Sequence, residues 1–250
     1  MTDLRLGDCL EVMKSIPDGS IDAIITDPPY GTTACKWDSV IDFDLMWEQL
    51  NRIIKPNGAI VLFGSEPFSS FLRMSNIKNY KYDWIWNKRK VTGFLNSKRR
   101  PLVQHELIHL FYKKQCLYKP QLHSNKLKRD FTGSLQKPHT DNYGKQKEYI
   151  STVSSDVSYP RSIIEQTGVV GNSNEKVAHP TQKPIALMEY LIKTYTNEKE
   201  TVLDFTMGSG STGVAAKNTN RNFIGIEQDA NYFDIATDRI SKEEKQLKIL

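Results

Sequence analysis

The spacing of hydrophobic positions changes along the chain and divides it into three stretches. Up to residue 114, short apolar runs alternate with segments whose apolar residues recur at helical spacing. Between Gln115 and Ala178 this periodicity is lost, and polar, basic and aromatic residues interleave with glycine and proline. From residue 179 the alternation returns. The pattern predicts a folded domain built from residues 1–114 and 179–250, with residues 115–178 as an irregular insertion.

The first stretch predicts alternating strands and helices. Strands are predicted at Leu4–Asp8, Ile21–Thr26 and Ala59–Phe63, and helices at Cys9–Ile16 and Asp42–Ile54. The run Ile21–Thr26 is apolar and rich in β-branched residues, which is typical of a parallel strand covered on both faces. Tyr80–Trp86 and Glu106–Tyr112 alternate in the strand manner and predict an antiparallel edge. This rhythm indicates an α/β protein with a doubly wound, mostly parallel sheet.

The last stretch completes the same fold. It predicts helices at Pro184–Thr196, Ser211–Lys217 and Asn231–Lys242, and strands at Thr201–Phe205 and Phe223–Glu227. A glycine-rich turn separates the strand at Thr201–Phe205 from the helix that follows it.

Charge is distributed unevenly along the 250 residues. Residues 76–147 contain 17 Lys or Arg and four acidic residues, so this stretch has a net charge of +13. The net charge of the whole chain is +5, which leaves −8 for the rest. A basic segment on an otherwise acidic body indicates a surface for a polyanion, although lysine-rich segments are also common on solvated surfaces.

Other features narrow the class of protein. No apolar run reaches the length of a membrane span, and the N-terminal residues lack the pattern of a signal peptide, so we expect a cytoplasmic protein with no membrane partner. The three cysteines and five histidines lack the spacing of a metal site, so we expect no metal. His105 and His109 fall in a strand-like stretch, which favours core or surface positions.

The tetrapeptide Asp27-Pro28-Pro29-Tyr30 directly follows a buried strand. In open α/β sheets ligands bind beyond the carboxyl ends of the strands, where this loop would lie. Two prolines stiffen the loop and leave its carbonyl groups as acceptors. The Asp27 carboxylate and the Pro28 carbonyl could therefore accept both hydrogens of an amino group, while the Tyr30 ring offers a stacking face for a base.

A second motif runs from Val202 to Gly213, where a strand enters a glycine-rich turn and a helix. Glycines let the backbone approach a ligand, and the start of a helix favours negative charge. The turn lacks the Gly-Lys-Ser/Thr ending of a Walker A loop. Glu227 ends the next predicted strand, where a nucleoside-binding fold places its ribose-binding carboxylate. A purely structural strand–turn–helix is the alternative for this motif alone.

Together these motifs resemble the DNA amino-methyltransferases, specifically the beta class, in which the catalytic motif precedes the cofactor motif. The order in this chain is Gly7-Asp8, Asp27-Pro28-Pro29-Tyr30, the insertion, His179-Pro180-Thr181-Gln182-Lys183-Pro184, the glycine loop and Glu227. The string His179–Pro184 is highly specific to this class. The resemblance covers nearly the whole chain except the insertion.

The resemblance implies S-adenosylmethionine as methyl donor, with no metal. Catalysis is implied for Asp27, Pro28, Pro29 and Tyr30. Asp8 would bind the cofactor adenine, Glu227 the ribose, and Asp204, Gly208 and Gly210 would surround the methionine moiety. Thr181, Gln182 and Lys183 would lie near the methionine carboxylate. A solvated lysine at a helix start is the alternative for Lys183. The family usually has Pro and Phe at the positions of Phe205 and Thr206, which leaves the aromatic contact to the cofactor open.

The resemblance further implies a division of the chain into three functional regions. Residues 1–114 would form the catalytic half, residues 115–178 a target-recognition region and residues 179–250 the cofactor-binding half. Double-stranded DNA would be the partner, with phosphate contacts from Lys88, Arg89, Lys90, Lys98, Arg99 and Arg100. Together with Trp84 and Trp86, these two basic runs could flank a DNA groove, and structural aromatics and phosphate-positioning side chains are equally good descriptions of them. A homodimer and a separately encoded restriction endonuclease are further partners that the resemblance raises.

These observations predict a site-specific DNA adenine-N6 methyltransferase of the restriction-modification type, which flips the adenine out of the duplex. Asp at the head of the catalytic tetrapeptide goes with adenine in the family, whereas Ser goes with cytosine. A cytosine-N4 enzyme stays open because both bases present an amino group. RNA or protein-glutamine methylation fits the basic insertion less well. A catalytically silent DNA-binding module is the alternative outside the enzymes.

Overall fold

The computed structural model describes residues 1–32, 38–124, 135–136, 139–140, 144–145, 149–150, 157–169, 176–177 and 182–247. They form two compact units, one made of Met1–Lys119 with Ser162–Leu250 and the other of Pro120–Arg161. Of the main unit, the first part contains β1 (Thr2–Leu6), α1 (Cys9–Met13), β2 (Ile21–Thr26), α2 (Phe43–Ile53), β3 (Ile54–Gly64), α3 (Phe68–Ser75), β4 (Tyr80–Thr92), η1 (Phe94–Asn96) and β5 (Val103–Phe111). The second part contains β12 (Ile163–Glu165), α4 (Ile185–Tyr195), β13 (Thr201–Asp204), α5 (Ser211–Asn218), β14 (Asn222–Glu227) and α6 (Ala230–Leu247).

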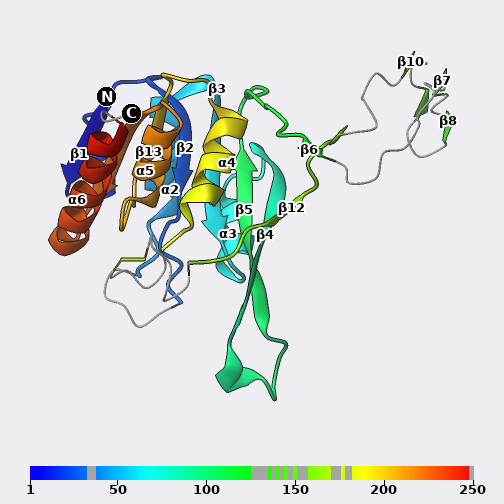
Figure 1. Cartoon of the computed structure of the whole chain (residues 1–250), viewed down its shortest axis with the longest axis horizontal. Coiled ribbons are helices and arrows are strands. Elements are labelled where there is room, and N and C mark those ends of the chain that lie inside the picture. The colour runs from blue at the N-terminus through cyan, green and yellow to red at the C-terminus, as the bar shows by residue number, and fades with distance from the viewer. Residues whose placement is uncertain are drawn as a thin grey trace. The chain divides into compact units, whose positions relative to one another are not determined.

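The main unit is built on one eight-stranded sheet, as Figure 1 shows. Its strand order is β1-β14-β13-β2-β3-β5-β4-β12. The pairs from β1 to β3 are all parallel, β5 runs antiparallel to both β3 and β4, and β12 is parallel to β4. The predicted doubly wound, mostly parallel sheet is therefore confirmed.

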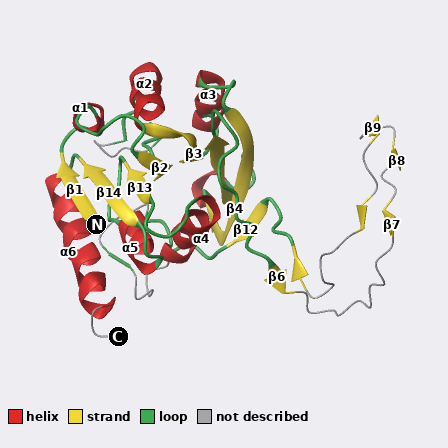
Figure 2. Cartoon of the chain, turned by 90° about the horizontal axis from the view of Figure 1, so that it is seen from above, coloured by secondary structure: helices red, strands yellow, loops and turns green. Residues whose placement is uncertain are grey.

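Helices cover both faces of this sheet. Figure 2 shows α1, α2 and α3 on one face and α4, α5 and α6 on the other. Each face has its own hydrophobic core: Met13, Leu50 and Leu72 pack on the first, and Leu191 and Ile240 on the second. The central strand β2 is buried on both faces, and this explains why its sequence is a continuous apolar run.

Two predictions about the sheet need correction. The strands β4 and β5 do not form its edge, because β12 pairs with β4 outside them. Residue Ile164 of β12 packs against the core, although the sequence placed it in the insertion. In addition, β1 ends at Leu6 rather than Asp8, because the Asp8 carboxylate accepts from the backbone N–H of Leu10 and caps α1.

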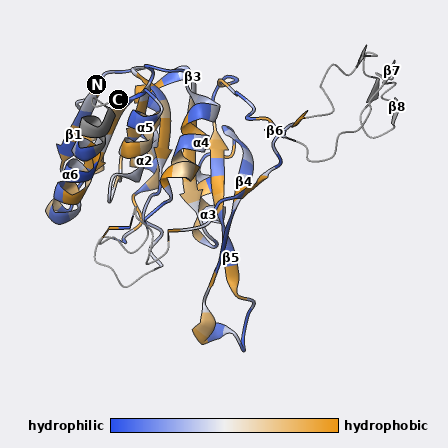
Figure 3. Cartoon of the chain, viewed as in Figure 1, coloured by the Kyte–Doolittle hydropathy of each residue, from blue (hydrophilic) through white to orange (hydrophobic). Residues whose placement is uncertain are grey.

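The strands β4 and β5 continue past the sheet as a long hairpin (Figure 1). Gly64, the last residue of β3, pairs with Leu107, so the part of β5 before Leu107 lies beyond the carboxyl ends of the parallel strands. Phe94 and Leu95 of η1 are exposed at the tip of the hairpin. Figure 3 shows hydrophobic and hydrophilic stretches side by side at this tip. The hairpin therefore extends from the sheet edge where an α/β fold binds its ligands.

The second unit, Pro120–Arg161, covers fewer residues than the predicted insertion of residues 115–178. It contains short antiparallel pairs: β6 (His123–Ser124) with β11 (Val157–Ser158), β7 (Leu135–Gln136) with β10 (Tyr149–Ile150), and β8 (His139–Thr140) with β9 (Gly144–Lys145). Residues 162–169 belong to the main unit instead, because β12 hydrogen-bonds to β4 and Gly168 N–H donates to the carbonyl of Lys88.

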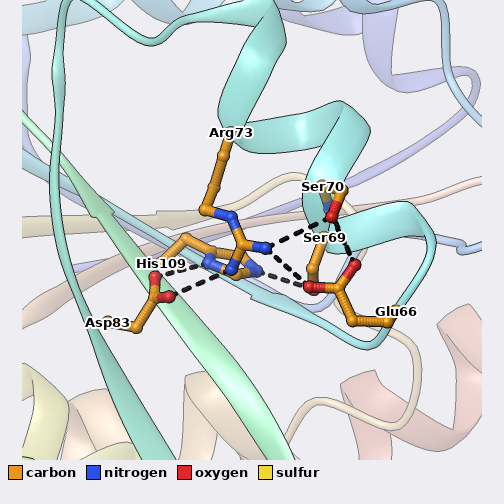
Figure 4. A network of polar contacts seen from close by, with 6 residues as sticks. All are labelled: Glu66, Ser69, Ser70, Arg73, Asp83 and His109. Carbon is orange, nitrogen blue, oxygen red and sulfur yellow. Dashed lines mark hydrogen bonds and ion pairs between the residues drawn. The ribbon is translucent and has the colours of Figure 1, made fainter.

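A buried polar network fixes α3 against β4 and β5 (Figure 4). His109 Nε2 lies 2.8 Å from Ser69 Oγ, and His109 Nδ1 lies 2.6 Å from Asp83 Oδ1. Arg73 bridges Asp83 and Glu66. The order Ser–His–Asp is that of a hydrolase, yet Ser69 and His109 are 0% exposed, so a substrate has no access to the hydroxyl. We interpret the network as structural, and it places His109 in the core, one of the two positions that the sequence left open.

No helix in the described parts of the chain is long and apolar enough to cross a membrane.

Candidate active site

A cavity of about 570 Å³ opens at the carboxyl ends of the parallel strands. Both sequence motifs line it, Asp27–Tyr30 from the loop after β2 and Asp204–Ser209 from the loop after β13. The two loops meet because β2 and β13 are neighbouring parallel strands. A cavity of this size is within the range of small-molecule sites.

Asp38 fixes the conformation of the loop after β2, which carries the predicted catalytic residues. Its carboxylate accepts hydrogen bonds from the backbone N–H groups of Tyr30, Gly31 and Thr32 at 2.8–2.9 Å. Three charge-assisted bonds to consecutive N–H groups hold the loop in one shape. Asp38 is buried at 8% exposure and was not identified from the sequence, since its partners are backbone atoms.

The side chains of Asp27 and Tyr30 contact each other in the cavity. The Tyr30 hydroxyl donates to Asp27 Oδ1 at 2.5 Å, and the Tyr30 ring packs on Phe68 with centroids 5.0 Å apart. Burial and the neighbouring Asp27 carboxylate raise the pKa of Tyr30 well above its usual value. The phenol therefore stays protonated and remains a donor.

Asp27 also contacts a basic group, Lys183, which in turn lies beside an acidic one. Its Oδ2 accepts a short hydrogen bond from Lys183, whose Nζ lies 3.4 Å from Glu106 Oε2. Lys88 donates to Glu106 Oε1 at 3.0 Å. Burial raises the pKa of Asp27, and Lys183 opposes that effect. For Glu106, the attraction of Lys183 and Lys88 outweighs burial and lowers the pKa.

Asp204, at the end of β13, holds the glycine loop through hydrogen bonds. Its carboxylate accepts from the hydroxyls of Thr26 (3.0 Å) and Thr212 (2.5 Å) and from the backbone N–H of Thr206 (3.2 Å). Burial raises the pKa of Asp204 to about 7. Phe205, the residue whose contact to the cofactor was left open, is 1% exposed in the core at the cavity wall.

Glu227 and Asp8 lie side by side at the other end of the cavity. Glu227 accepts from the backbone N–H groups of Gly208 (2.8 Å) and Asp229 (2.9 Å). Burial raises its pKa. Gly208 has a φ of +50°, a conformation that favours glycine at the cavity wall. Glu227, Asp8 and Gly208 all line the cavity, and the hydrogen bonds of the two carboxylates are to the protein itself.

The other predicted cofactor residues differ in their surroundings. Gly210 is buried against α6, where a Cβ would lie 3.0 Å from the Cβ of Ala236. Gln182 lines the cavity and accepts from the backbone N–H of Val177 at 3.0 Å. Lys183 lies at the catalytic end of the cavity beside Asp27. Thr181 lies outside the described residues.

Of the six basic residues predicted to contact DNA, two form ion pairs with glutamates and the other four are exposed. Lys88 is 16% exposed and paired with Glu106, and Arg89 is paired with Glu165 at 3.0 Å. Lys90 is exposed and lines the cavity. The remaining three, on the hairpin after η1, are exposed: Lys98, Arg99 and Arg100.

Several residues of the cavity lie outside the predicted catalytic and cofactor-binding sets. Trp86 and Glu106 reach it from the base of the hairpin, and Gly168 and Val169 reach it from the segment after β12. Among the described residues, no group of three or more His, Cys, Asp or Glu is placed to hold a metal ion.

Comparisons with known proteins agree with this geometry. The family model of the DNA methylases, named for N6 and N4 methylation, matches residues 21–238. The chain is 30% identical over 256 residues to the Type II methyltransferase M.HpaI of Haemophilus parainfluenzae, covering 96% of this chain and 75% of that protein. It is also 30% identical over 268 residues to the Type II methyltransferase M.HinfI of Haemophilus influenzae, covering 94% and 67%.

Solved structures of DNA methyltransferases also align with most of this chain. The crystal structure of the M1.HpyAVI–SAM complex aligns with a TM-score of 0.64 at 30% identity, covering 96% of this chain and 99% of that one. The cytosine-N4-specific PvuII DNA methyltransferase aligns with a TM-score of 0.68 at 16% identity, covering 98% and 92%, and at that identity it supports the fold alone.

Proposed function

Because this chain belongs to the DNA methylase family, whose members transfer methyl groups from S-adenosylmethionine to amino nitrogens of DNA bases, we propose that it is a site-specific adenine-N6 methyltransferase. The observation that carries the proposal is the placement of Asp27. Its carboxylate lies in the cavity, on a loop fixed by two prolines and Asp38, and beside the glycine loop. The target adenine would enter this cavity by leaving the duplex stack.

The catalytic loop would act by positioning the target amine. Asp27 accepts one N–H of the amine and the Pro28 carbonyl accepts the other, while Pro29 keeps the loop rigid. This arrangement directs the nitrogen lone pair away from the base ring and toward the methyl donor. The Tyr30 ring stacks on the base. S-adenosylmethionine supplies a methyl group already activated by its sulfonium, so the protein contributes orientation and electrostatics.

The cavity residues fit a nucleoside cofactor of this kind. Glu227 would accept from the ribose hydroxyls, and Asp8 would bind the adenine. Asp204 and Gly208 would shape the methionine end, together with Thr181 and Gln182, while Gly210 would support the glycine loop from its place against α6. The sequence predicted Lys183 for the same end, whereas its hydrogen bond is to Asp27. Two observations support this fit. Gly208 adopts a positive φ at the cavity wall, where it carries no side chain, and the carboxylates of Glu227 and Asp8 lie at the ends of the adjacent strands β14 and β1. In this structure Glu227 accepts from the N–H of Gly208 and Asp8 from the N–H of Leu10.

For DNA, we propose that the β4–β5 hairpin provides the phosphate contacts nearest the cavity. Lys98, Arg99 and Arg100 are exposed on it, and Lys90 lies at the cavity wall. Lys88 and Arg89, already paired with Glu106 and Glu165, contribute less. The region 115–178 would supply sequence choice, and exchanging it for a relative's region should change the methylated site.

Adenine is favoured over cytosine by Asp27 at the head of the motif. Double-stranded DNA incubated with enzyme and cofactor should be digested to nucleosides and analysed by mass spectrometry, where we expect N6-methyladenine. N4-methylcytosine without N6-methyladenine would overturn the base assignment and leave the family intact. The Asp27→Ala variant should lose transfer by several orders of magnitude and still bind cofactor, because its contact matters mainly in the transition state.

We also propose a homodimer and a separately encoded restriction endonuclease as partners. Light scattering with and without DNA tests the dimer, and a monomer mass under both conditions would reject it.

A further inference from the structure

Four charged side chains that are largely shielded from water, from separate parts of the chain, meet at one end of the cavity. Asp27 follows β2, Lys88 lies on β4, Glu106 on β5, and Lys183 precedes α4. They form a row in which Lys183 contacts Asp27 and Glu106, and Lys88 contacts Glu106. Two acidic and two basic groups make the row neutral.

These charges depend on one another because they are shielded from water. The side chains of Lys183, Lys88 and Glu106 are 8%, 16% and 18% exposed. A buried charge without a partner costs several kcal/mol, on the order of 3–5 when one member of a pair is removed. The ring of Phe63, 5.1 Å from Lys183 Nζ, adds a further contact to the ammonium.

The contacts of Lys183 are unequal. Its hydrogen bond is to Asp27 Oδ2, whereas Glu106 Oε2 is buried, lies 3.4 Å away and has no hydrogen-bond partner within the described part of the chain. A separation of 3.4 Å is longer than a normal N–H···O bond. Glu106 Oε2 is therefore an open acceptor beside an ammonium that is held by Asp27.

The same Asp27 carboxylate is needed by the substrate. Tyr30 occupies Oδ1 and Lys183 occupies Oδ2. A target amine that donates to Asp27 must share or replace one of these bonds. A shift of Lys183 toward Glu106 would free Asp27 Oδ2 without leaving the ammonium unpaired.

We propose that Lys183 and Glu106 are positioning residues for Asp27: Lys183 keeps Asp27 an ionised acceptor in the free protein, and Glu106 takes the Lys183 ammonium when the target amine donates to Asp27. The inference rests on the proposed methyl transfer and gives Lys183 a different role from binding the methionine carboxylate. It also gives Glu106 a role that the sequence did not indicate.

The proposal requires opposite electrostatic effects from the two residues. The charged and titratable groups facing Asp27 are Lys183 before α4, Glu106 on β5 with Lys88 on β4 behind it, Asp204 on β13 and Tyr30 on its own loop. The charge of Lys183 lowers the pKa of Asp27 and that of Glu106 raises it, against the raising effect of burial. Removing Lys183 should raise the pKa of Asp27, and neutralising Glu106 should lower it.

The test compares the pH dependence of kcat/KM for DNA methylation in the wild type, Lys183→Met, Lys183→Arg and Glu106→Gln. We expect the acid limb to move up by at least one pH unit in Lys183→Met, to return toward the wild type in Lys183→Arg, and to move down in Glu106→Gln. We expect kcat to fall at least tenfold in Lys183→Met, and several-fold in Glu106→Gln because Lys183 then stays on Asp27. Lys193→Met is the matched control, since it removes a charge from the exposed side of α4.

Two further measurements make the outcome decisive. Calorimetry of S-adenosylmethionine binding should give similar affinity in Lys183→Met and the wild type. A large loss of affinity with an unmoved acid limb would overturn the proposal and assign Lys183 to the cofactor carboxylate. Carbon-13 NMR titration of aspartate carboxyl groups, assigned with Asp27→Asn, should show the same opposite shifts in the free protein.

Unmoved titration of Asp27 in both variants would also reject the proposal. If the wild type methylates no DNA, the proposed function fails, while the NMR titration still decides whether Lys183 and Glu106 control Asp27.

Discussion

The hydroxyl of Thr206 donates a hydrogen bond to the backbone carbonyl of Asp27, with 3.0 Å between the two oxygens. The bond joins the glycine loop to the catalytic loop across 179 positions of sequence. A second bond, from Thr26 to Asp204, joins the strands beneath them at 3.0 Å. The glycine loop and the loop that carries Asp27 are therefore held in a fixed relation by two threonine hydroxyls. A phenylalanine at position 206 could not make the first bond.

We expect Thr206→Val to lower kcat of methyl transfer by about 2- to 12-fold, the equivalent of a hydrogen bond worth about 0.5–1.5 kcal/mol. The substitution keeps the shape of the side chain and removes the hydroxyl. Thr206→Ser, which retains the hydroxyl, should stay close to the wild type. Equal rates for the valine and serine variants would show that this bond does not position Asp27.

Asp38 should matter more, because it holds three N–H groups of the catalytic loop. We expect Asp38→Ala to reduce kcat at least tenfold, since bonds to a charged acceptor contribute about 1.5–3 kcal/mol each. Asp38→Asn keeps part of the acceptor set and should lie between the alanine variant and the wild type. Circular dichroism checks the fold, and a full rate for a folded alanine variant would contradict a positioning role.

Much of the fold could be predicted from local sequence, and the residues that control the site could not. The run Ile21–Thr26 and the motif after it place Asp27 at the cavity, because a buried parallel strand determines where its loop lies. Asp38 acts on backbone N–H groups, so its role depends on a loop conformation that residue types do not reveal. Glu106 reaches Asp27 through Lys183, and that approach depends on the order β3-β5-β4 of the sheet.

The edge strand β12 was missed for a related reason. Three residues, Ile163–Glu165, are too few to show a period, and their pairing partner β4 lies some eighty positions earlier in the chain. Long-range pairing of this kind is determined by the sheet rather than by local pattern. The same segment brings Gly168 and Val169 to the cavity wall, although they lie in the stretch predicted as an insertion.

We expect the exposed basic residues of the β4–β5 hairpin to contribute to DNA affinity. Replacing Lys98, Arg99 and Arg100 together by Gln should weaken binding to all duplex sequences. The slope of log K against log salt should flatten by about 0.9 for each phosphate that the variant no longer neutralises. The Arg89→Gln variant should change the slope less, because Arg89 is paired with Glu165. An unchanged slope for the triple variant, measured by fluorescence anisotropy, would place the phosphate-binding side chains elsewhere.

The buried network of Figure 4 predicts a loss of stability without a loss of chemistry. Ser69→Ala leaves His109 Nε2 buried without its partner, so the free energy of unfolding should fall by about 1–3 kcal/mol in urea denaturation. Ser70→Ala, on the exposed side of α3, should change it by less than about 0.5 kcal/mol. Methyl transfer should persist in both. Loss of transfer in a folded Ser69→Ala variant would assign the network to function.

Asp204 predicts a pH dependence of stability with a defined sign. Burial raises its pKa from 3.8 to about 7, so between these values the folded protein holds a proton that the unfolded chain has released. The contribution of Asp204 to the free energy of unfolding therefore falls as pH rises through this window, by up to roughly 1.4 kcal/mol per pH unit.

Asp204→Asn isolates this contribution. The asparagine oxygen can accept from Thr26 and from the backbone of Thr206, and its amide can donate to Thr212, so the loop keeps its bonds and loses its titration. Other groups titrate in the same range, and the informative quantity is the difference between variant and wild type. We expect urea denaturation to show that Asp204→Asn gains stability relative to the wild type as pH rises from 4 to 7. A constant difference across that range would mean that Asp204 ionises in the folded protein as easily as in the unfolded chain.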